Sequence, residues 1–325
     1  MEEEIFQQRT DLSDLNQRMN AIRTEIGKVI IGQHKMLDLL IIGLLCDGHI
    51  LIEGVPGVAK TLTAKLVAKI IDVDFSRIQF TPDLMPSDVV GTSVFNPKEG
   101  DFYFKPGPVF SNIILIDEIN RAPAKTQAAL FEVMEERQVT VDGVTHEMRF
   151  PFIILATQNP VEQEGTYRLP EAQLDRFIFK IDVQYPTLIE EIGILNSQHG
   201  STQNELLTQV NKIVSVAEIY AYRSTIQSIL VEPRLIEFIA KIVVETRNNP
   251  ALYLGASPRA SLAILRAAKA NAAIKGRDFV TPEDIVEMAT PVLRHRIILT
   301  PEKEMEGVTP DDLIESILKA IEVPR

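Results

Sequence analysis

The 325-residue sequence has few of the side chains that metal centres and thiol chemistry require. It contains one cysteine, Cys46, and five scattered histidines, so it shows no cluster of protein ligands for a metal ion. Cys46 lies in an apolar stretch with helical spacing, where a buried structural thiol is expected rather than a nucleophile.

Long apolar runs are also missing. The longest, Met36–Cys46, contains Asp38 and is too short to cross a bilayer, which takes roughly 20 apolar residues. The N-terminal residues Met1–Glu4 are acidic and lack the basic segment of a signal peptide. We therefore expect a cytoplasmic protein without a membrane span.

Positive charge is scarce: the formal net charge is −12. This balance makes a nucleic-acid-wrapping surface an unfavourable interpretation, although a local basic channel is compatible with it. The apolar fraction of 45% is sufficient for a large core, and the chain length suggests two domains.

From residue 50 onward, short apolar runs typical of strands alternate with helical patterns. This alternation predicts the α/β class, with a parallel sheet covered by helices, and the nearly continuous apolar runs fit strands buried on both faces. The predicted strands are Ile50–Ile52, Ile78–Phe80, Ile113–Ile116, Phe152–Ala156 and Phe177–Val183.

Two inserts interrupt this alternation. Residues 82–110 are rich in proline, glycine and aromatic residues and favour turns. Residues 138–148 predict a β-hairpin, because Asp142-Gly143 between alternating strands is typical of a type I′ turn. A plain surface loop is the alternative for the second insert.

After residue 187 the strand signal fades and the chain becomes mostly helical. Thr281-Pro282 and Thr309-Pro310 are helix starts, each with a capping residue, a proline and acids in the first turn. We therefore predict an α/β domain over residues 1–187 and a helical domain over 188–325.

The sequence from Gly54 carries the clearest functional signal. An apolar strand, a glycine-containing loop, a Lys-Thr pair and a helix form the layout of a phosphate-binding loop, whose backbone N–H groups surround phosphates. Lys60 would reach the β- and γ-phosphates, and the Thr61 hydroxyl would bind Mg²⁺. An ordinary loop with a chance Lys-Thr is the alternative. The candidate nucleotide-binding residues here are Gly54, Val55, Pro56, Gly57, Val58, Ala59, Lys60, Thr61 and Leu62.

Ala59 departs from the general pattern, which has glycine before the lysine. The additional methyl group is acceptable if this residue has helical backbone angles.

Two acids follow the apolar run Ile113–Ile116. A buried strand would deliver Asp117 and Glu118 at its carboxyl end, where ligands bind in open α/β sheets. Asp117 would hold Mg²⁺ through water, and Glu118 would orient the attacking water or accept its proton. A strand end followed by a capped helix is the structural alternative.

Three further residues are candidates for contacts with the γ-phosphate. Asn159, at the end of the strand run Phe152–Ala156, could bind it or the attacking water, although Asn before Pro is also a common turn. Arg176, after a short helix, could reach a neighbouring subunit's site, or could simply complement the helix dipole. Arg259 lies in the first turn of a helix capped by Ser257, where a cation is unfavourable unless a phosphate lies nearby.

Taken together and in this order, these segments resemble the AAA+ ATPase superfamily and, within it, the MoxR family. The similarity extends over nearly the whole chain, and Ala59 is itself usual in that family. The segments that carry it are Gly54–Thr61, Asp117–Leu130, Met134–Val141, Ala156–Pro160, Glu164–Phe177, Gly255–Arg259 and Pro291–Ile297.

The resemblance implies a P-loop αβα core with a helix-2 insert and a pre-sensor-1 hairpin, followed by a helical lid. It implies ATP or ADP and Mg²⁺ as ligands. Lys60 and Thr61 match Walker A, Asp117 and Glu118 match Walker B, Asn159 matches sensor 1, Arg176 the arginine finger, and Arg259 sensor 2. The adenine would be lined by Ile31, Gly32 and Gln33 within Val29–Gln33.

The expected activity is Mg²⁺-dependent ATP hydrolysis that drives chaperone-like remodelling, maturation or activation of partner proteins. The resemblance also implies a hexameric ring and partners with von Willebrand factor A domains; the protein substrate is unknown. One alternative is a nucleotide-dependent binding switch with slow hydrolysis. Another is a DNA-processing motor, which the acidic charge and the hairpin tip without Lys or Arg oppose.

Overall fold

The computed structural model describes residues 10–55, 59–159, 167, 169–199 and 203–324, which form two compact units. The sheet unit comprises the described parts of 23–40 and 47–216, and the helical unit those of 1–22, 41–46 and 217–325. The division falls within helices α1 (Ser13–Gly27) and α2 (His34–Leu45). The domain boundary after residue 187 stays a prediction.

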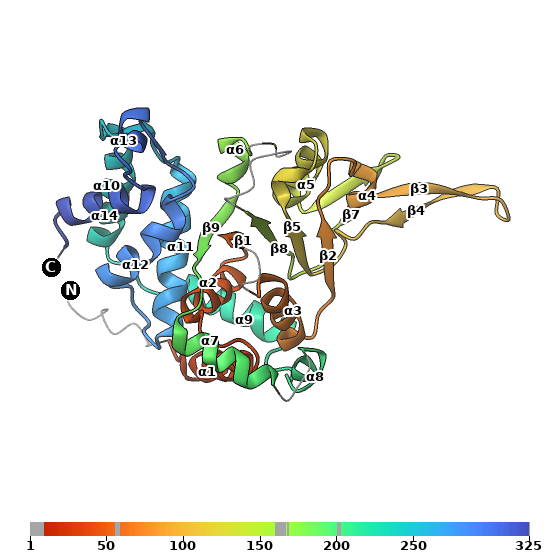
Figure 1. Ribbon diagram of the computed structural model, residues 1–325, viewed down its shortest axis with the longest axis horizontal. Coiled ribbons are helices and arrows are strands. Elements are labelled where there is room, and N and C mark those ends of the chain that lie inside the picture. The colour runs from red at the N-terminus through yellow and green to blue at the C-terminus, as the bar shows by residue number, and fades with distance from the viewer. Residues whose placement is uncertain (1–9, 56–58, 160–166, 168, 200–202, 325) are drawn as a thin grey trace, which may run out of the picture. The chain divides into compact units, whose positions relative to one another are not determined.

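The centre of the sheet unit is a five-stranded parallel sheet in the order β2-β5-β8-β1-β9 (Figure 1). Every residue of β5 is buried, and the other central strands are nearly so, which explains their continuous apolar sequences. The α/β class and all five predicted strands are confirmed. Their bounds are β1 His49–Gly54, β2 Phe75–Gln79, β5 Ile113–Asp117, β8 Ile153–Gln158 and β9 Phe177–Val183.

Helices connect these strands, as parallel strands require. After β1 comes α3, whose apolar face, including Leu62, Leu66 and Ile70, is buried. After β5 comes α5, which contributes Leu130, Phe131 and Met134 to the core. The helices of this unit beyond α1 and α2 are α3 Lys60–Ile71, α4 Pro86–Val90, the 3₁₀ turn η1 Ile119–Arg121, α5 Ala124–Glu136, α6 Glu171–Leu174, α7 Leu188–Gln198 and α8 Gln203–Thr208.

The hairpin predicted over 138–148 is confirmed as β6 (Gln138–Val141) and β7 (Val144–Glu147). Asp142 and Gly143 both have positive φ, 50° and 79°, as a type I′ turn requires.

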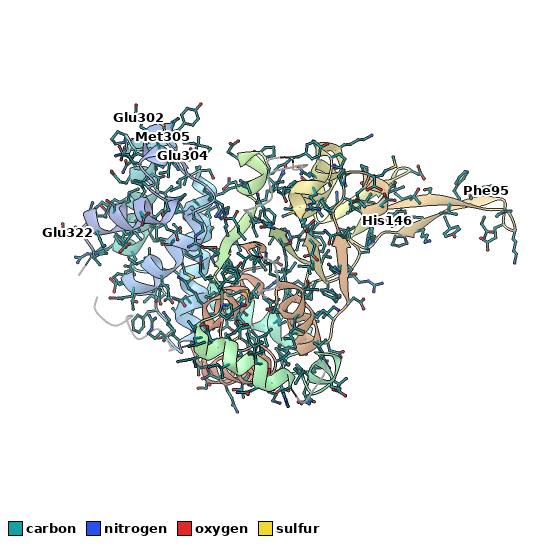
Figure 2. The ribbon with its side chains drawn as sticks, viewed as in Figure 1. Phe95, His146, Glu302, Glu304, Met305 and Glu322 are labelled. Atoms are coloured by element: carbon teal, nitrogen blue, oxygen red, sulfur yellow. The ribbon has the colours of Figure 1, made fainter. Side chains whose placement is uncertain are left out.

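The turn-rich insert contains a second antiparallel hairpin that its sequence did not lead us to predict, formed by β3 (Gly91–Asn96) and β4 (Asp101–Pro106). This hairpin extends away from the sheet, with Phe95 toward its far end and His146 of β7 closer to its base (Figures 1 and 2). The His146 ring stacks on Phe104 of β4 with centroids 4.3 Å apart, and Ser93 donates a hydrogen bond to Asp142. The two hairpins therefore contact each other directly.

The helical unit contains mainly helices, with β10 (Leu252–Leu254) paired to β11 (Ile298–Leu299). The predicted helix starts are confirmed: Thr281 and Thr309 each form a capping box, with proline at the first helical position. Among the described residues, no helix is long and apolar enough to cross a membrane. The helices are α9 Val216–Gln227, α10 Pro233–Asn248, α11 Pro258–Ile274, α12 Pro282–Leu293, α13 Pro301–Met305 and α14 Pro310–Ala320.

Candidate functional site

The sheet topology brings most of the predicted site residues to one end of the parallel strands, which we call the carboxyl edge of the sheet. Strand β8 pairs with β5 on one side and with β1 on the other. Since the strands are parallel, their carboxyl ends meet, and each is followed by one of the predicted polar segments. This edge therefore collects the loop after β1, the acids at the end of β5 and the amide at the end of β8.

Lys60 begins α3 and turns back toward β1. Its Nζ donates a hydrogen bond to the carbonyl oxygen of Gly54 at 2.5 Å. Burial lowers the pKa of the Lys60 ammonium, while the carboxylates of Asp117, Glu53 and Glu118 act in the opposite direction. The ammonium therefore lies at the same end of the sheet as Asp117, the predicted metal ligand, and Glu118, the predicted base.

Within the predicted phosphate-binding loop, Gly54, Val55 and Ala59 to Leu62 are described, and Pro56, Gly57 and Val58 lie outside the described residues. Thr61 is half-buried in the first turn of α3. Leu62, which we predicted as a nucleotide contact, is 8% exposed on the apolar face of α3. Its side chain belongs to the buried apolar core.

The backbone of Ala59 differs from the helical conformation under which we considered its methyl group acceptable. Ala59 has φ 58° and ψ 19°, in the left-handed region. That conformation disfavours a Cβ atom, which explains why glycine is general at this position.

Asp117 is held by residues of both neighbouring strands. The Thr157 hydroxyl on β8 donates to Oδ1 at 3.1 Å, and Arg77 on β2 forms an ion pair with Oδ2 at 2.6 Å. Asp117 is 9% exposed, so its carboxylate has a fixed position at the end of β5. A carboxylate and the Thr61 hydroxyl are hard oxygen donors of the kind that Mg²⁺ prefers.

Glu118 adopts a left-handed conformation, with φ 56°. Its backbone N–H donates to the Thr157 hydroxyl at 3.1 Å. Its Oε2 accepts from Gln79 at 3.0 Å and pairs with Nε of Arg121 at 2.9 Å. Two residues thus orient the carboxylate and a third holds the backbone, while about a third of the Glu118 side chain is exposed.

The sequence did not lead us to name Thr157, Arg77, Gln79 or Arg121. Thr157 carried a usable signal, because a polar residue within a buried strand needs a hydrogen-bond partner. Arg77 and Gln79 carried none, since their positions on β2 become neighbours of the acids only through strand pairing. Asn159 follows directly after β8, at the same edge and half-buried.

The predicted adenine segment packs against α7. Gly32 has φ 74°, and a Cβ atom there would lie 2.1 Å from the carboxylate oxygen of Glu190. Ile31 is close to Gly193, where a Cβ atom would lie 3.0 Å from its side chain. Hydrogen bonds from Thr187 hold the pKa of Glu190 below its usual range, with a smaller effect from the Gln33 backbone.

Arg176 lies at the amino edge of the sheet, the end at which the parallel strands begin. It precedes Phe177, which pairs with His49 at the amino end of β1, whereas Val183 pairs with Gly54 at the carboxyl end. Strand β9 covers roughly 20 Å between these ends, at about 3.3 Å per residue. Arg176 therefore cannot join the site of its own chain, because an arginine side chain is much shorter than this strand.

Arg259 belongs to the helical unit. Ser257 caps α11 as predicted, with its hydroxyl accepting from the Arg259 N–H at 3.2 Å, and Pro258 follows the cap. Arg259 is exposed in the first turn.

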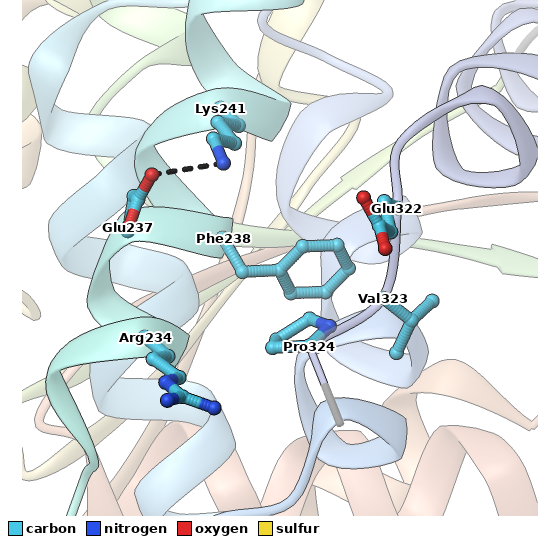
Figure 3. A pocket seen from close by; sticks show the side chains of 7 residues that line it. All are labelled: Arg234, Glu237, Phe238, Lys241, Glu322, Val323 and Pro324. Atoms are coloured by element: carbon cyan, nitrogen blue, oxygen red, sulfur yellow. Dashed lines mark ion pairs between the residues drawn. The ribbon is translucent and has the colours of Figure 1, made fainter.

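The helical unit also has a pocket of about 390 Å³ between α10 and residues 322–324, around Phe238 and the Glu237–Lys241 ion pair (Figure 3). None of the predicted site residues lines it.

The chain matches two protein families over parts of its length. Residues 49–179 match the ATPase family associated with various cellular activities (AAA), and residues 244–317 match the AAA lid domain. The first match includes both edges of the sheet described above.

Similar proteins are known from several bacteria. The uncharacterized protein YeaC of Bacillus subtilis is 44% identical over 96% of each chain. Chaperone MoxR1 of Mycobacterium tuberculosis is 42% identical over 93% of this chain and 81% of its own. The crystal structure of a candidate ATPase from Cytophaga hutchinsonii is 44% identical, has a TM-score of 0.87, and is matched over 96% of this chain and 97% of its own.

Proposed function

The chain belongs to the MoxR family of AAA+ ATPases, and we propose that it hydrolyses ATP with Mg²⁺ to remodel, mature or activate partner proteins. The observation that carries the proposal is the meeting of Lys60 with Asp117 and Glu118 at one sheet edge. A cation for phosphate, an acid for a metal ion and a second acid for water are the groups that phosphoryl transfer to water needs.

In this proposal, residues Gly54 to Leu62 bind the phosphates of ATP or ADP, and Ile31, Gly32 and Gln33 line the adenine. Lys60 would exchange its hydrogen bond with Gly54 for one with a phosphate oxygen. Thr61 and Asp117 would hold Mg²⁺, which neutralises charge on the phosphates when bound. Arg77 keeps the Asp117 carboxylate oriented. Asp117 would then contact the Mg²⁺ ion through a bound water.

Glu118 would act as the base. Its carboxylate accepts a proton from water, the water oxygen bonds to the γ-phosphorus, and the bond to the bridging oxygen breaks, so that ADP leaves. Because Gln79 and Arg121 both contact Oε2, neither of these contacts has to break for Oε1 to bind the water. Asn159 would bind the water or the γ-phosphate from the end of β8.

Arg176 would complete the site of the adjacent subunit. Its place at the amino edge of the sheet supports this role, since it is separated from Lys60 of its own chain by the length of β9. Assembly, which we expect as a hexameric ring, would then be required for hydrolysis. Arg259, in a lid that we place over residues 188–325, would contact phosphate as sensor 2. A cytoplasmic location and a partner with a von Willebrand factor A domain stay predictions.

Three variants test the proposal. Lys60→Ala should weaken ATP binding at least 100-fold, because a buried phosphate contact is lost, whereas Glu118→Gln should bind ATP and lose turnover. Lys65→Ala is the control, since Lys65 is exposed on the same helix. Nucleotide binding and steady-state phosphate release should be measured with each. Full turnover in Glu118→Gln would refute the assignment of the base, and negligible turnover of the wild type with every partner added would favour a binding switch.

A further inference from the structure

The side chain of Arg176 is held by two residues of α5 that are one helical turn apart. Its Nε forms an ion pair with Oε2 of Glu135 at 3.0 Å. Its guanidinium carbon lies 6.0 Å from the centre of the Phe131 ring. Residues i and i+4 share a helix face, so Phe131 and Glu135 form one contact surface for the arginine.

The inner residue of this contact surface, Phe131, is held firmly in the core. Phe131 is 1% exposed and contacts Phe177 edge-to-face, with ring centroids 6.0 Å apart. Phe177 follows Arg176 directly and begins β9, so the same aromatic contact fixes the backbone that carries the arginine. The outer contact, with Glu135, is more exposed: the side chains of Arg176 and Glu135 are 27% and 37% accessible. An ion pair this exposed contributes little to folding, which leaves orientation of the guanidinium as its role.

The geometry of the ion pair suits that role. A guanidinium has five N–H donors in a planar fork, and Glu135 contacts the one on Nε. The Nη groups form the end of the fork that binds phosphate oxygens in a bidentate manner. A carboxylate at Nε therefore fixes the plane of the guanidinium without occupying its outer end.

We propose that Glu135 is the positioning residue of Arg176, holding Nε so that the Nη groups face the γ-phosphate bound by the adjacent subunit. This inference rests on the proposed function, which assigns Arg176 to the neighbour's site. Without Glu135, the guanidinium would rotate over Phe131 among several orientations, and few of them would serve the transition state. The effect should therefore fall on turnover rather than on ATP affinity.

The test uses full-length Glu135→Ala and Glu135→Gln, with Glu136→Gln as the control because Glu136 is an exposed neighbour on α5. We expect Glu135→Ala to lower kcat about 10-fold with little change in KM for ATP, by analogy with other residues that orient a catalytic group. Glu135→Gln, which keeps an acceptor for Nε–H, should retain more activity, and Glu136→Gln should match the wild type. Wild-type kcat in Glu135→Ala would overturn the inference.

Two further measurements separate positioning from a general structural role. Adding Glu135→Ala to Arg176→Ala should cost nothing more, because the positioned group is gone. Mixing Glu135→Ala subunits with Glu118→Gln subunits should restore turnover, since the latter supply an intact Arg176 and Glu135 to neighbouring sites. A further loss of turnover in the double variant would overturn the inference about Glu135 alone. The same holds if turnover does not recover on mixing, although a mixture of Arg176→Ala with Glu118→Gln subunits does recover it. Full activity of Arg176→Ala would overturn both it and the trans assignment of Arg176.

Discussion

The hydroxyl of Thr157 donates a hydrogen bond to Oδ1 of Asp117 at 3.1 Å and accepts one from the backbone N–H of Glu118 at 3.1 Å. One side chain on β8 thus holds both the carboxylate of Asp117 and the backbone of Glu118 at the end of β5. The contact is possible because β5 and β8 are neighbours in the sheet, with Ile116 opposite Ala156.

Replacing Thr157 should therefore impair the acids without disturbing the sheet. Thr157→Val keeps the shape and removes the hydroxyl, and we expect a loss of about 10- to 100-fold in Mg²⁺-supported turnover. Thr157→Ser, which keeps the hydroxyl, should retain most of the activity. The measurement is steady-state ATPase rate against Mg²⁺ concentration, and equal rates for the Val and Ser variants would contradict the prediction.

The left-handed backbone of Ala59 leads to a prediction about stability. Ala59→Gly should stabilise the nucleotide-free protein by about 0.5–1 kcal/mol, since glycine adopts positive φ without the Cβ penalty. Ala64→Gly, inside α3 and 0% exposed, is the matched control and should destabilise by about 1 kcal/mol or more. Denaturant unfolding measures both, and a change of the same sign in the two variants would contradict the reasoning.

His49 should make folding sensitive to acid. Its Nδ1 accepts from the Ile154 N–H at 3.0 Å, so its proton is on Nε2, 3.2 Å from the carbonyl oxygen of Met134. Burial, and then the positive charge of Arg137, lower the pKa of this imidazole from 6.5 to about 4. The folded state therefore resists a proton that the unfolded chain accepts, and stability falls as the pH drops from 6.5 toward 4.

The lowered pKa of His49 should change the free energy of unfolding by about 3 kcal/mol over this pH range. His49→Phe should be less stable than the wild type at pH 7, because Ile154 N–H and Met134 C=O lose their partner. This difference should narrow as the pH falls through the same range, since the variant has no imidazole to protonate. Urea unfolding across this range measures the gap, and a constant gap would rule out the predicted linkage.

In the helical unit, Asp284 is the centre of a buried network. Its side chain is 0% exposed and binds both Nη groups of Arg277 at 2.6 Å, as well as the Thr281 N–H at 3.0 Å. Burial raises the pKa of Asp284, but the Arg277 guanidinium and the Thr281 N–H bring it below its usual range.

Asp284→Asn should destabilise the protein by about 3–5 kcal/mol, because it removes the charge of a fully buried carboxylate whose bonds to Arg277 are shielded from water. Asp311→Asn is the control, since Asp311 pairs with Arg294 in the same unit but is 46% exposed, and it should cost less than about 1 kcal/mol. Urea denaturation gives both values. Similar losses in the two variants would show that burial is not the deciding factor.

Much of the fold followed from local patterns. The five strands of the parallel sheet, the β6–β7 hairpin and the capped helices at Thr281 and Thr309 each have a signal within a few residues, through apolar runs, turn chemistry and caps. The β3–β4 hairpin was missed because its strands are exposed and aromatic, with Phe102 65% accessible, so they carry no buried face to set a pattern. The conformation of Ala59 was missed because a loop's dihedral angles depend on the strand and helix that it joins.

The sequence by itself determined the chemical groups of this protein: Lys60 and Thr61 in a loop between strand and helix, Asp117 and Glu118 after a buried strand, and a cap before Arg259. These depend on neighbours in the chain, and local order is sufficient to specify them. Only the tertiary structure decided the partners, because strand order is a long-range property. It brought Thr157, Arg77 and Gln79 to the acids, and it placed Arg176 with Glu135 at the far edge of the sheet, out of reach of the site of its own chain.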